Sequence, residues 1–324
     1  MSKPKVIVIC GPTASGKTAL SIELAKKING EIISADSMQI YEDMDIGTAK
    51  VSEEEMDGIK HYLVGHISPT TRYSVADFKK DAILAIEEIL KKGKTPIIVG
   101  GTGLYVDSLV NGIEYDDYEI DIEYRNELEK IAEEKGLSYV YDKAKEIDPE
   151  AIKKISENDK KRIFRILEIF HSTGKTKTQQ NEESVKKENP YDYYVFAIDM
   201  LREKLYERIN LRVDIMIEKG LVEEVKNLIK KYDELPTAMQ GLGYKEVVAY
   251  LNNECTYEEM IEKIKLETRH YAKRQLTWFR RNKDIIWLDG LSERNKNIEI
   301  ILDSVKNAWY NSFQIGVIAL RKEW

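Results

Sequence analysis

The chain has 324 residues and a mass of 37.5 kDa, which suggests about two domains, or one domain that carries an insertion. Hydrophobic residues make up 42% and charged residues 33%, so there is enough apolar material for a core and too little compositional bias for long disorder. The net charge of −7 and two widely spaced cysteines exclude a uniformly basic nucleic-acid binder, a disulfide scaffold and a cysteine-based zinc module. No apolar stretch approaches the roughly 20 residues of a membrane span, and we expect a cytoplasmic protein.

The first hundred residues alternate between strand and helix patterns. An apolar, β-branched run over 5–10 predicts a buried strand, and helical spacing from Lys17 predicts a helix that ends at Asn29 and Gly30. A second strand over 31–34, a helix over 75–90 and a third strand over 96–99 follow. Because strands joined by helical crossovers run parallel, the pattern predicts an α/β fold with a parallel sheet.

Between the first strand and the first helix, the sequence matches the phosphate-binding pattern GxxxxGK[ST] at every fixed position. In such a loop, backbone N–H groups and the helix dipole attract a pyrophosphate, the lysine adds a positive charge, and the final hydroxyl is a ligand for Mg²⁺. The loop consists of Gly11, Pro12, Thr13, Ala14, Ser15, Gly16, Lys17 and Thr18. We therefore expect a diphosphate site here, with Mg²⁺ at Thr18.

Two further segments follow the ends of predicted strands. Asp36 comes directly after the second strand, where a parallel sheet places its carboxylate beside the phosphate loop. Kinases of small molecules use an acid at this position to take the acceptor's proton, and a turn cap is the structural alternative. Gly100–Tyr105 follows the third strand, where the glycines would admit a ligand close to the backbone and the Thr102 hydroxyl could reach the crevice. A plain strand–helix turn would look similar.

The rest of the chain is mostly helical. We expect helices over roughly 121–135 and 149–172, a strand over 193–198, helices through most of 202–282, a strand over 285–288 and a helix over 293–309. These elements predict a P-loop NTPase-like core over 1–115 and 191–310. An all-helical domain is inserted over 116–190, and a loosely ordered tail occupies 311–324.

Two basic segments stand out in this acidic chain. Residues 153–177 hold 8 bases and 3 acids, and residues 263–283 hold 8 bases and 1 acid. Solvated helix faces would explain both. Aromatic residues interleave with the second segment, which favours binding to a polyanion.

Several blocks together carry a family resemblance. They are Gly11–Thr18, Ser34–Tyr41 with Met44–Lys50, Tyr73–Phe78, Gly100–Tyr105, Arg208–Met216 with Gly220 and Leu221, Gly243–Glu246, and Thr268–Arg280. In this order, over about residues 4–290, they resemble the tRNA dimethylallyltransferases, also called tRNA isopentenyltransferases. The resemblance implies transfer of a dimethylallyl group from dimethylallyl diphosphate to N6 of the adenosine that follows the anticodon in certain tRNAs.

The resemblance also implies roles for individual residues. Asp36 would be the general base, and Lys17, Arg212 and Mg²⁺ at Thr18 would stabilise the leaving diphosphate. Thr102 would contact the base and the bridging oxygen. The residues implied on the tRNA side are Asp36, Ser37, Met38, Gln39, Thr102, Arg125, Lys161, Arg162, Arg165, Gln240, Gly241, Gly243, Tyr244, Lys245, Lys273, Arg274, Gln275 and Arg280.

One departure from the family pattern lies in the insertion, where Lys160 and Lys161 replace its Pro and Gln. Contacts to phosphates should survive this change, whereas a specific amide hydrogen bond would not.

Two alternatives stay open at this point. A P-loop small-molecule or nucleoside kinase would need ATP and would use no prenyl donor. A non-catalytic RNA-binding protein could use the basic segments alone, but it would have no reason to keep Asp36 beside an intact phosphate loop. We expect a monomer, because no exposed heptad seam suggests a dimer.

Overall fold

The computed structural model describes residues 3–113, 121–185 and 188–306. Two compact units divide the chain: one is formed by Met1–Val106 and Pro190–Trp324, the other by Asp107–Asn189. The helical insertion expected over 116–190 overlaps the second unit, which starts earlier because helix α4 (Gly103–Val110) runs across the boundary. The tail expected over 311–324 lies outside the described residues.

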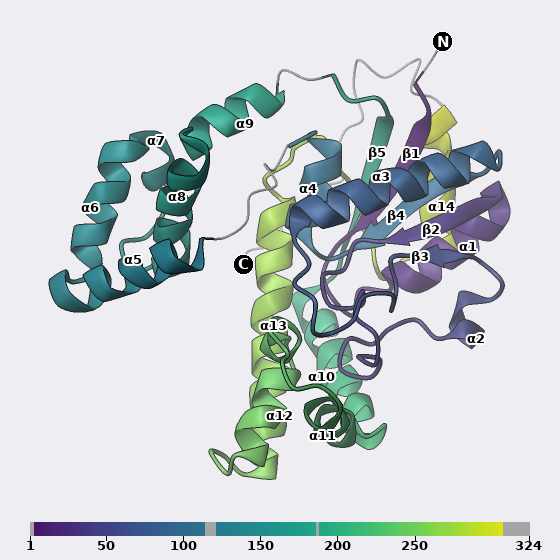
Figure 1. Cartoon of the computed structure of the whole chain (residues 1–324). Helices are drawn as coiled ribbons and strands as arrows, with labels where there is room; N and C mark the ends of the chain where they lie inside the picture. Colours follow the sequence, from purple (N-terminus) through teal and green to yellow (C-terminus); the bar gives the residue numbers. More distant parts are fainter. Residues whose placement is uncertain (1–2, 114–120, 186–187, 307–324) are drawn as a thin grey trace. The chain divides into compact units, whose positions relative to one another are not determined.

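The first unit is built on a parallel sheet (Figure 1). Its strands, in spatial order β3-β2-β4-β1-β5-β6, are β3 (His61–Tyr62), β2 (Gly30–Ser34), β4 (Thr95–Gly100), β1 (Lys5–Cys10), β5 (Asp192–Asp199) and β6 (Ile286–Asp289). Every pairing is parallel, for example Cys10 with Gly100 and with Ala197. The α/β prediction is therefore confirmed.

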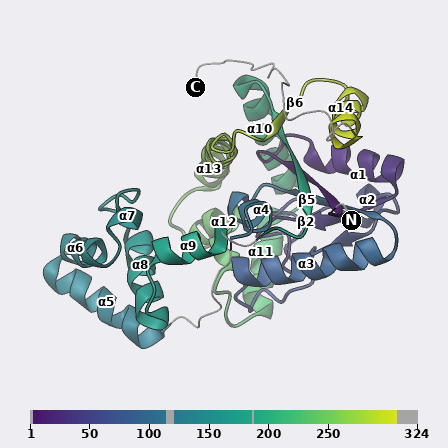
Figure 2. The same ribbon diagram turned by 90° about the horizontal axis from the view of Figure 1, so that it is seen from above.

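Helices cover both faces of the sheet (Figure 2). One face carries α1 (Lys17–Ile28) and α14 (Arg294–Lys306), and the opposite face carries α3 (Val75–Lys91). The strands are apolar along almost their whole length because both of their faces are buried. The apolar core on the α1 face includes Ile7, Ile9, Leu24, Ile32 and Ile97.

A group of helices gathers beside the carboxyl ends of the strands. These are α10 (Arg202–Glu218), α11 (Leu221–Lys231), the short 3₁₀ helix η1 (Ala238–Gln240), α12 (Tyr244–Leu251) and α13 (Tyr257–Phe279). The long helix α13 begins at a capping box, in which Thr256 and Glu259 each bond the other's backbone N–H. A short helix, α2 (Glu53–Met56), lies between β2 and β3.

The second unit is helical. Two helices were predicted in it, and the prediction of a continuous helix over 149–172 was wrong. The helix expected over 149–172 is interrupted: α7 (Pro149–Ile152) ends early, and α8 (Lys160–Thr173) starts afresh where the Asp159 carboxylate accepts the Arg162 N–H. The helices α6 (Leu137–Ile147) and α9 (Lys177–Val185) were not anticipated, whereas α5 (Ile122–Lys135) was. Leu128, Val140, Phe164 and Leu167 belong to a separate apolar core.

None of the helices in the described ranges is both long and apolar enough to cross a membrane.

Candidate active site

The phosphate loop has the backbone that its sequence requires. Gly16 caps the start of α1 with a φ of 93°, a conformation that glycine adopts without strain. Gly11 lies so close to β5 that an added Cβ would meet the Ile198 carbonyl oxygen at 3.1 Å. Ser15 Oγ is buried without a hydrogen-bond partner among the described residues. The loop therefore offers an unused polar group in addition to its backbone amides.

A cavity of about 340 Å³ opens at this loop, within the first unit. Its lining combines the cations Lys17 and Arg212 with the carboxylate of Asp36. Apolar side chains complete the wall, among them Val99, Ile209, Val213, Met216 and Ile264. A ligand with an anionic end and a small apolar part would match this lining.

Two half-buried cations stand close together in the cavity. Lys17 Nζ donates a hydrogen bond to the Pro12 carbonyl oxygen at 2.6 Å, and Arg212 Nη1 donates to Thr13 Oγ1 at 3.4 Å. Burial and the neighbouring Arg212 guanidinium lower the pKa of Lys17 to about 8, while the Asp36 carboxylate opposes this shift. Burial also lowers the pKa of Arg212. The pKa values of both cations remain lowered although the Asp36 carboxylate raises them, and a bound diphosphate would add negative charge beside the pair.

Asp36 forms a turn just beyond β2. Its Oδ1 accepts the backbone N–H groups of Met38 at 2.9 Å and Gln39 at 3.3 Å. These bonds fix the carboxylate in place. Asp36 thus forms the turn that the structural alternative expected, and the same side chain lines the cavity, so its role as general base stays a prediction.

The glycines at the end of β4 pack closely against other parts of the protein, and Gly100 and Gly101 also line the cavity. An added Cβ would meet the Ala35 carbonyl oxygen at 2.1 Å from Gly100, Gln275 Nε2 at 2.2 Å from Gly101, and the Trp278 ring at 2.3 Å from Gly103. Because these glycines lack a side chain, they leave room for the backbone at the end of β2 and for side chains of α13.

Thr102 lies among these contacts. Its Oγ1 accepts the Ser37 backbone N–H at 3.1 Å and lies 3.3 Å from Ser37 Oγ, and its side chain is near enough to Tyr271 to lower the pKa of that hydroxyl. The loop at the end of β4 is thus joined to the Asp36 segment and to α13.

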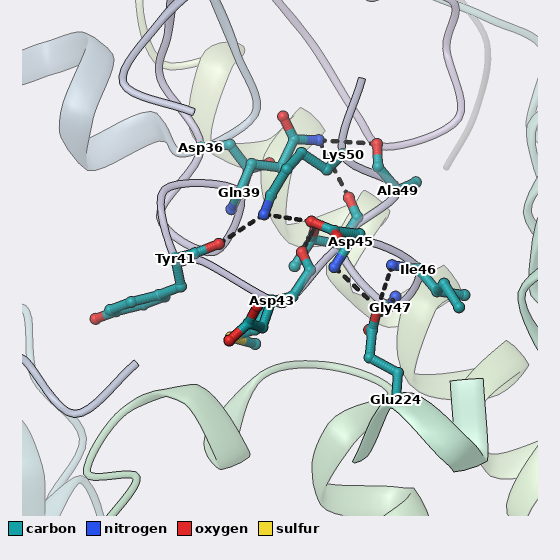
Figure 3. A network of polar contacts seen from close by, with 12 residues as sticks. Asp36, Gln39, Tyr41, Asp43, Asp45, Ile46, Gly47, Ala49, Lys50 and Glu224 are labelled. Atoms are coloured by element: carbon teal, nitrogen blue, oxygen red, sulfur yellow. Dashed lines mark hydrogen bonds and ion pairs between the residues drawn. The ribbon is translucent and has the colours of Figure 1, made fainter. Parts of the chain in front are cut away.

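The segment after Asp36 is held by a carboxylate from α11 (Figure 3). Glu224 accepts the backbone N–H groups of Asp45, Ile46 and Gly47 at 2.7–3.0 Å, and the Tyr244 hydroxyl at 2.6 Å. Lys50 closes the turn by donating to the Tyr41 carbonyl oxygen at 2.7 Å and to Asp45 at 2.5 Å. This network gives the cavity wall a fixed shape.

Several residues expected at an RNA surface are engaged within the protein. Tyr244 is 1% exposed, and the Gly47 backbone packs so tightly on its ring that an added Cβ would lie 2.5 Å away. Gln39 donates its side-chain amide to the carbonyl oxygens of Thr48 and Ala49. Gln275 is 6% exposed. These three residues line the cavity, and their contact with tRNA stays a prediction.

The other residues of the first unit that were expected to contact tRNA fall into two groups: some line the cavity, and others have exposed side chains. Ser37 and Met38 line the cavity, and so do the buried backbone positions Gly241 and Gly243. Arg280 pairs with Asp199, its Nη2 lying 3.4 Å from the carboxylate. The exposed side chains are Gln240, Lys245, Lys273, Arg274 and Arg280.

In the second unit, the candidates fall into two groups. Arg125 pairs with the buried carboxylate of Glu168 at 3.1 Å, so part of its charge is committed to the core of this unit. Lys161 and Arg162 are exposed at the start of α8, and Arg165 follows one turn later.

The sequence analysis did not single out some residues of the cavity in the first unit and of the cation cluster in the second unit. Burial together with the positive charges of Arg165 and Arg162 lowers the pKa of Lys177, which reveals a cluster of cations at the starts of α8 and α9. Glu224 and Tyr271 were also missed as site residues. The spacing of Tyr271 four residues before Gln275, on one side of α13, was the available signal.

Together, the parallel sheet, the phosphate loop and the cavity define an α/β enzyme of the P-loop class. The model of the IPP transferase family matches residues 39–282, well over half of the chain. The protein therefore belongs to the IPP transferase family.

Relatives with known names agree with this assignment. The tRNA dimethylallyltransferase of Acetivibrio thermocellus is 53% identical over 285 residues, covering 88% of this chain and 91% of the relative. That of Lachnoclostridium phytofermentans is 49% identical over 302 residues, covering 93% and 96%.

Solved structures agree as well. The tRNA isopentenylpyrophosphate transferase from Bacillus halodurans superposes with a TM-score of 0.71 at 42% identity, over 94% of this chain and 96% of that chain. A eukaryotic dimethylallyltransferase described as acting on tRNA gives a TM-score of 0.80 at 33% identity, over 97% and 81%. The resemblance drawn from the motifs is confirmed, and the kinase alternative is not favoured.

Proposed function

We propose that this protein transfers the dimethylallyl group of dimethylallyl diphosphate to N6 of the adenosine that follows the anticodon in tRNA. The observation that carries the proposal is a single cavity lined by Lys17, Arg212 and Asp36. The two cations suit a diphosphate, the apolar wall suits a five-carbon chain, and the fixed carboxylate suits proton removal. The names of the relatives supply the chemical identity of donor and acceptor.

In the proposed reaction, the bond between C1 of the prenyl chain and the diphosphate oxygen breaks, and the electron pair leaves with the diphosphate. The bond from adenine N6 to C1 forms, and N6 gives its proton to Asp36. An exocyclic adenine amine is a poor nucleophile because its lone pair is delocalised into the ring. A base positioned to take its proton therefore lowers the barrier.

The charge on the leaving diphosphate grows as the bond breaks. The loop amides, Lys17 and Arg212 would stabilise it. Because these groups are in place before the reaction, little reorganisation is needed.

Mg²⁺ is part of the proposal. No group of three or more His, Cys, Asp or Glu side chains suited to a metal occurs in the described ranges. The donor set at the loop nevertheless fits Mg²⁺, which commonly binds through substrate phosphates, waters and few protein ligands. The Thr18 hydroxyl lines the cavity at the start of α1 and would be that ligand. Bound with the diphosphate, Mg²⁺ would neutralise part of its charge.

For the tRNA, we propose contacts from each unit. Lys273 and Arg274 on α13, Lys245 on α12 and the cation cluster of Arg162 and Arg165 suit the phosphate backbone. The target adenine must leave its stack to reach a cavity, as in other enzymes that modify bases.

Incubation with unmodified tRNA, Mg²⁺ and dimethylallyl diphosphate labelled in its chain tests the proposal. We expect label in tRNA, and none when the adenosine after the anticodon is replaced by guanosine. Equal labelling of both tRNAs would reject the proposed acceptor.

A further inference from the structure

The side chain of Gln275 joins three parts of the molecule. Its Oε1 accepts the backbone N–H of Thr13 in the phosphate loop at 2.9 Å, and its Nε2 donates to the Gly101 carbonyl oxygen after β4 at 2.8 Å. The residue itself belongs to α13. One amide group thus connects the phosphate loop, the loop after β4 and the helix that carries Lys273 and Arg274.

The surroundings leave this amide no other arrangement. Gln275 is 6% exposed, and a Cβ placed on Gly101 would lie 2.2 Å from its Nε2. Rotating the amide by half a turn would set Nε2 against the Thr13 N–H and Oε1 against the Gly101 carbonyl. Both hydrogen bonds would be replaced by repulsions.

The hydrogen bond to Thr13 lies next to a residue of the phosphate loop that has an unusual backbone conformation. The next residue, Ala14, has a φ of 62°, in the left-handed region that residues with a Cβ rarely adopt. Such a conformation persists only where the surrounding contacts impose it. Here the Thr13 N–H is held by Gln275, and the Thr13 hydroxyl accepts a bond from Arg212. These contacts fix the chain at the entrance to the loop.

The same helix also reaches the Asp36 segment. Tyr271, one turn before Gln275, lies close enough to Thr102 and Gln275 for both to lower its pKa, and Thr102 accepts the Ser37 N–H. Side chains of α13 therefore lie beside both the phosphate loop and the loop that holds Ser37.

We propose that Gln275 is a positioning residue that holds the phosphate loop in its diphosphate-binding shape and ties that shape to α13. It acts through Thr13 and Gly101 and does not touch the tRNA. This role replaces the RNA contact expected from the sequence, and it rests on the proposed function of the cavity as the donor site.

The first test replaces the amide without emptying its space. Gln275→Met keeps the length of the side chain and removes both hydrogen bonds. We expect the Kd for pyrophosphate, measured by titration calorimetry with Mg²⁺, to rise about tenfold, the scale of losing one to two intramolecular hydrogen bonds. The KM for dimethylallyl diphosphate should rise and kcat should fall, while the Kd for tRNA stays unchanged.

Two neighbours on α13 provide matched controls. Thr277→Ala alters an exposed side chain that bonds only its own helix, and it should leave pyrophosphate and tRNA binding as in the parent protein. Lys273→Ala should weaken tRNA binding and leave pyrophosphate binding unchanged, because Lys273 is exposed and lies outside the cavity lining. A Gln275→Met variant that weakens tRNA binding with normal pyrophosphate binding would overturn the proposal.

A double-mutant cycle makes the test independent of folding defects. Gly101→Ala should displace the Gln275 amide and weaken pyrophosphate binding about as much as Gln275→Met does. In a Gln275→Ala background the same Gly101→Ala change should have little further effect, because the side-chain amide with which the added methyl group would clash is absent. Additive effects of the two changes on the pyrophosphate Kd would contradict the proposed link.

The outcomes separate this inference from the proposed function. If the parent protein binds no pyrophosphate and transfers no prenyl group, the donor site itself is wrong. If the parent does both and the Gln275 variants match it, only the positioning role fails.

Discussion

Lys17 Nζ bonds the carbonyl oxygen of Pro12 at 2.6 Å, so the phosphate loop holds its own lysine across the loop. This bond keeps the ammonium in the cavity although Arg212 repels it. It also makes Lys17 the group whose protonation most directly controls the charge of the site. Its pKa is lowered to about 8 by burial and by Arg212.

We predict that donor binding weakens as the pH rises above about 8. Below that pH, Lys17 is charged and attracts the diphosphate. Above it, Lys17 is neutral in the ligand-free protein and must take up a proton when the diphosphate binds. The KM for dimethylallyl diphosphate should rise up to tenfold per pH unit in this range. Lys17→Arg should flatten the profile, because a guanidinium stays charged. A profile for the parent as flat as that of Lys17→Arg would contradict the assignment of Lys17.

We predict that Asp36→Asn lowers kcat at least about a hundredfold, the usual scale of general base catalysis. Pyrophosphate binding should persist, because asparagine keeps an oxygen that can accept the Met38 and Gln39 N–H groups. Single-turnover kinetics and titration calorimetry measure the two quantities. Turnover close to that of the parent would leave Asp36 with its turn-forming role alone.

We predict that tRNA affinity falls steeply with salt although the protein is acidic. Removing two phosphate contacts with Arg162→Ala and Arg165→Ala should flatten the slope of log affinity against log salt by roughly one to two. A control with the same loss of charge in the same unit is Lys135→Ala with Lys143→Ala, whose side chains stack on Tyr139 instead. Equal slopes for the two double variants would show that the arginines do not contact phosphates.

We predict that Glu224→Ala destabilises the protein by about 3 kcal/mol, because three backbone N–H groups and the Tyr244 hydroxyl lose a charged acceptor. Tyr244→Phe removes one of these bonds and should cost about 1 kcal/mol. Urea unfolding followed by fluorescence measures both. Equal losses for the two variants would mean that the bonds to the 45–47 backbone contribute little.

Five of the six strands were predictable because they are short apolar runs separated by helical patterns, whereas the two-residue strand β3 (His61–Tyr62) is too short to leave such a pattern. The phosphate loop was predictable because few other local structures place two glycines and a lysine in this pattern. The sequence pattern did not show in which direction neighbouring side chains point. Arg274 and Gln275 are adjacent, yet successive helical residues point about 100° apart, so one is exposed and the other buried.

Long-range contacts were beyond the sequence for a related reason. Nothing local shows that Gly100, Gly101 and Gly103 face β2 and α13, because a glycine required by packing and one required by a ligand look alike. Likewise, Glu224 and the segment 45–47 are far apart in the chain and meet only in the folded protein. In the second unit, Asp159 could have been recognised as a helix cap, but the apolar residues around it suggested one continuous helix.

The most direct measurement of the central claim follows the two possible donors in parallel. Unmodified tRNA is incubated with Mg²⁺ and either dimethylallyl diphosphate labelled in the prenyl chain or ATP labelled in the γ-phosphate, and the tRNA is digested to nucleosides. The proposed mechanism predicts prenyl label on N6 of one adenosine, with diphosphate released, and no transfer from ATP. Transfer of the γ-phosphate, with no prenyl label in the tRNA, would contradict it.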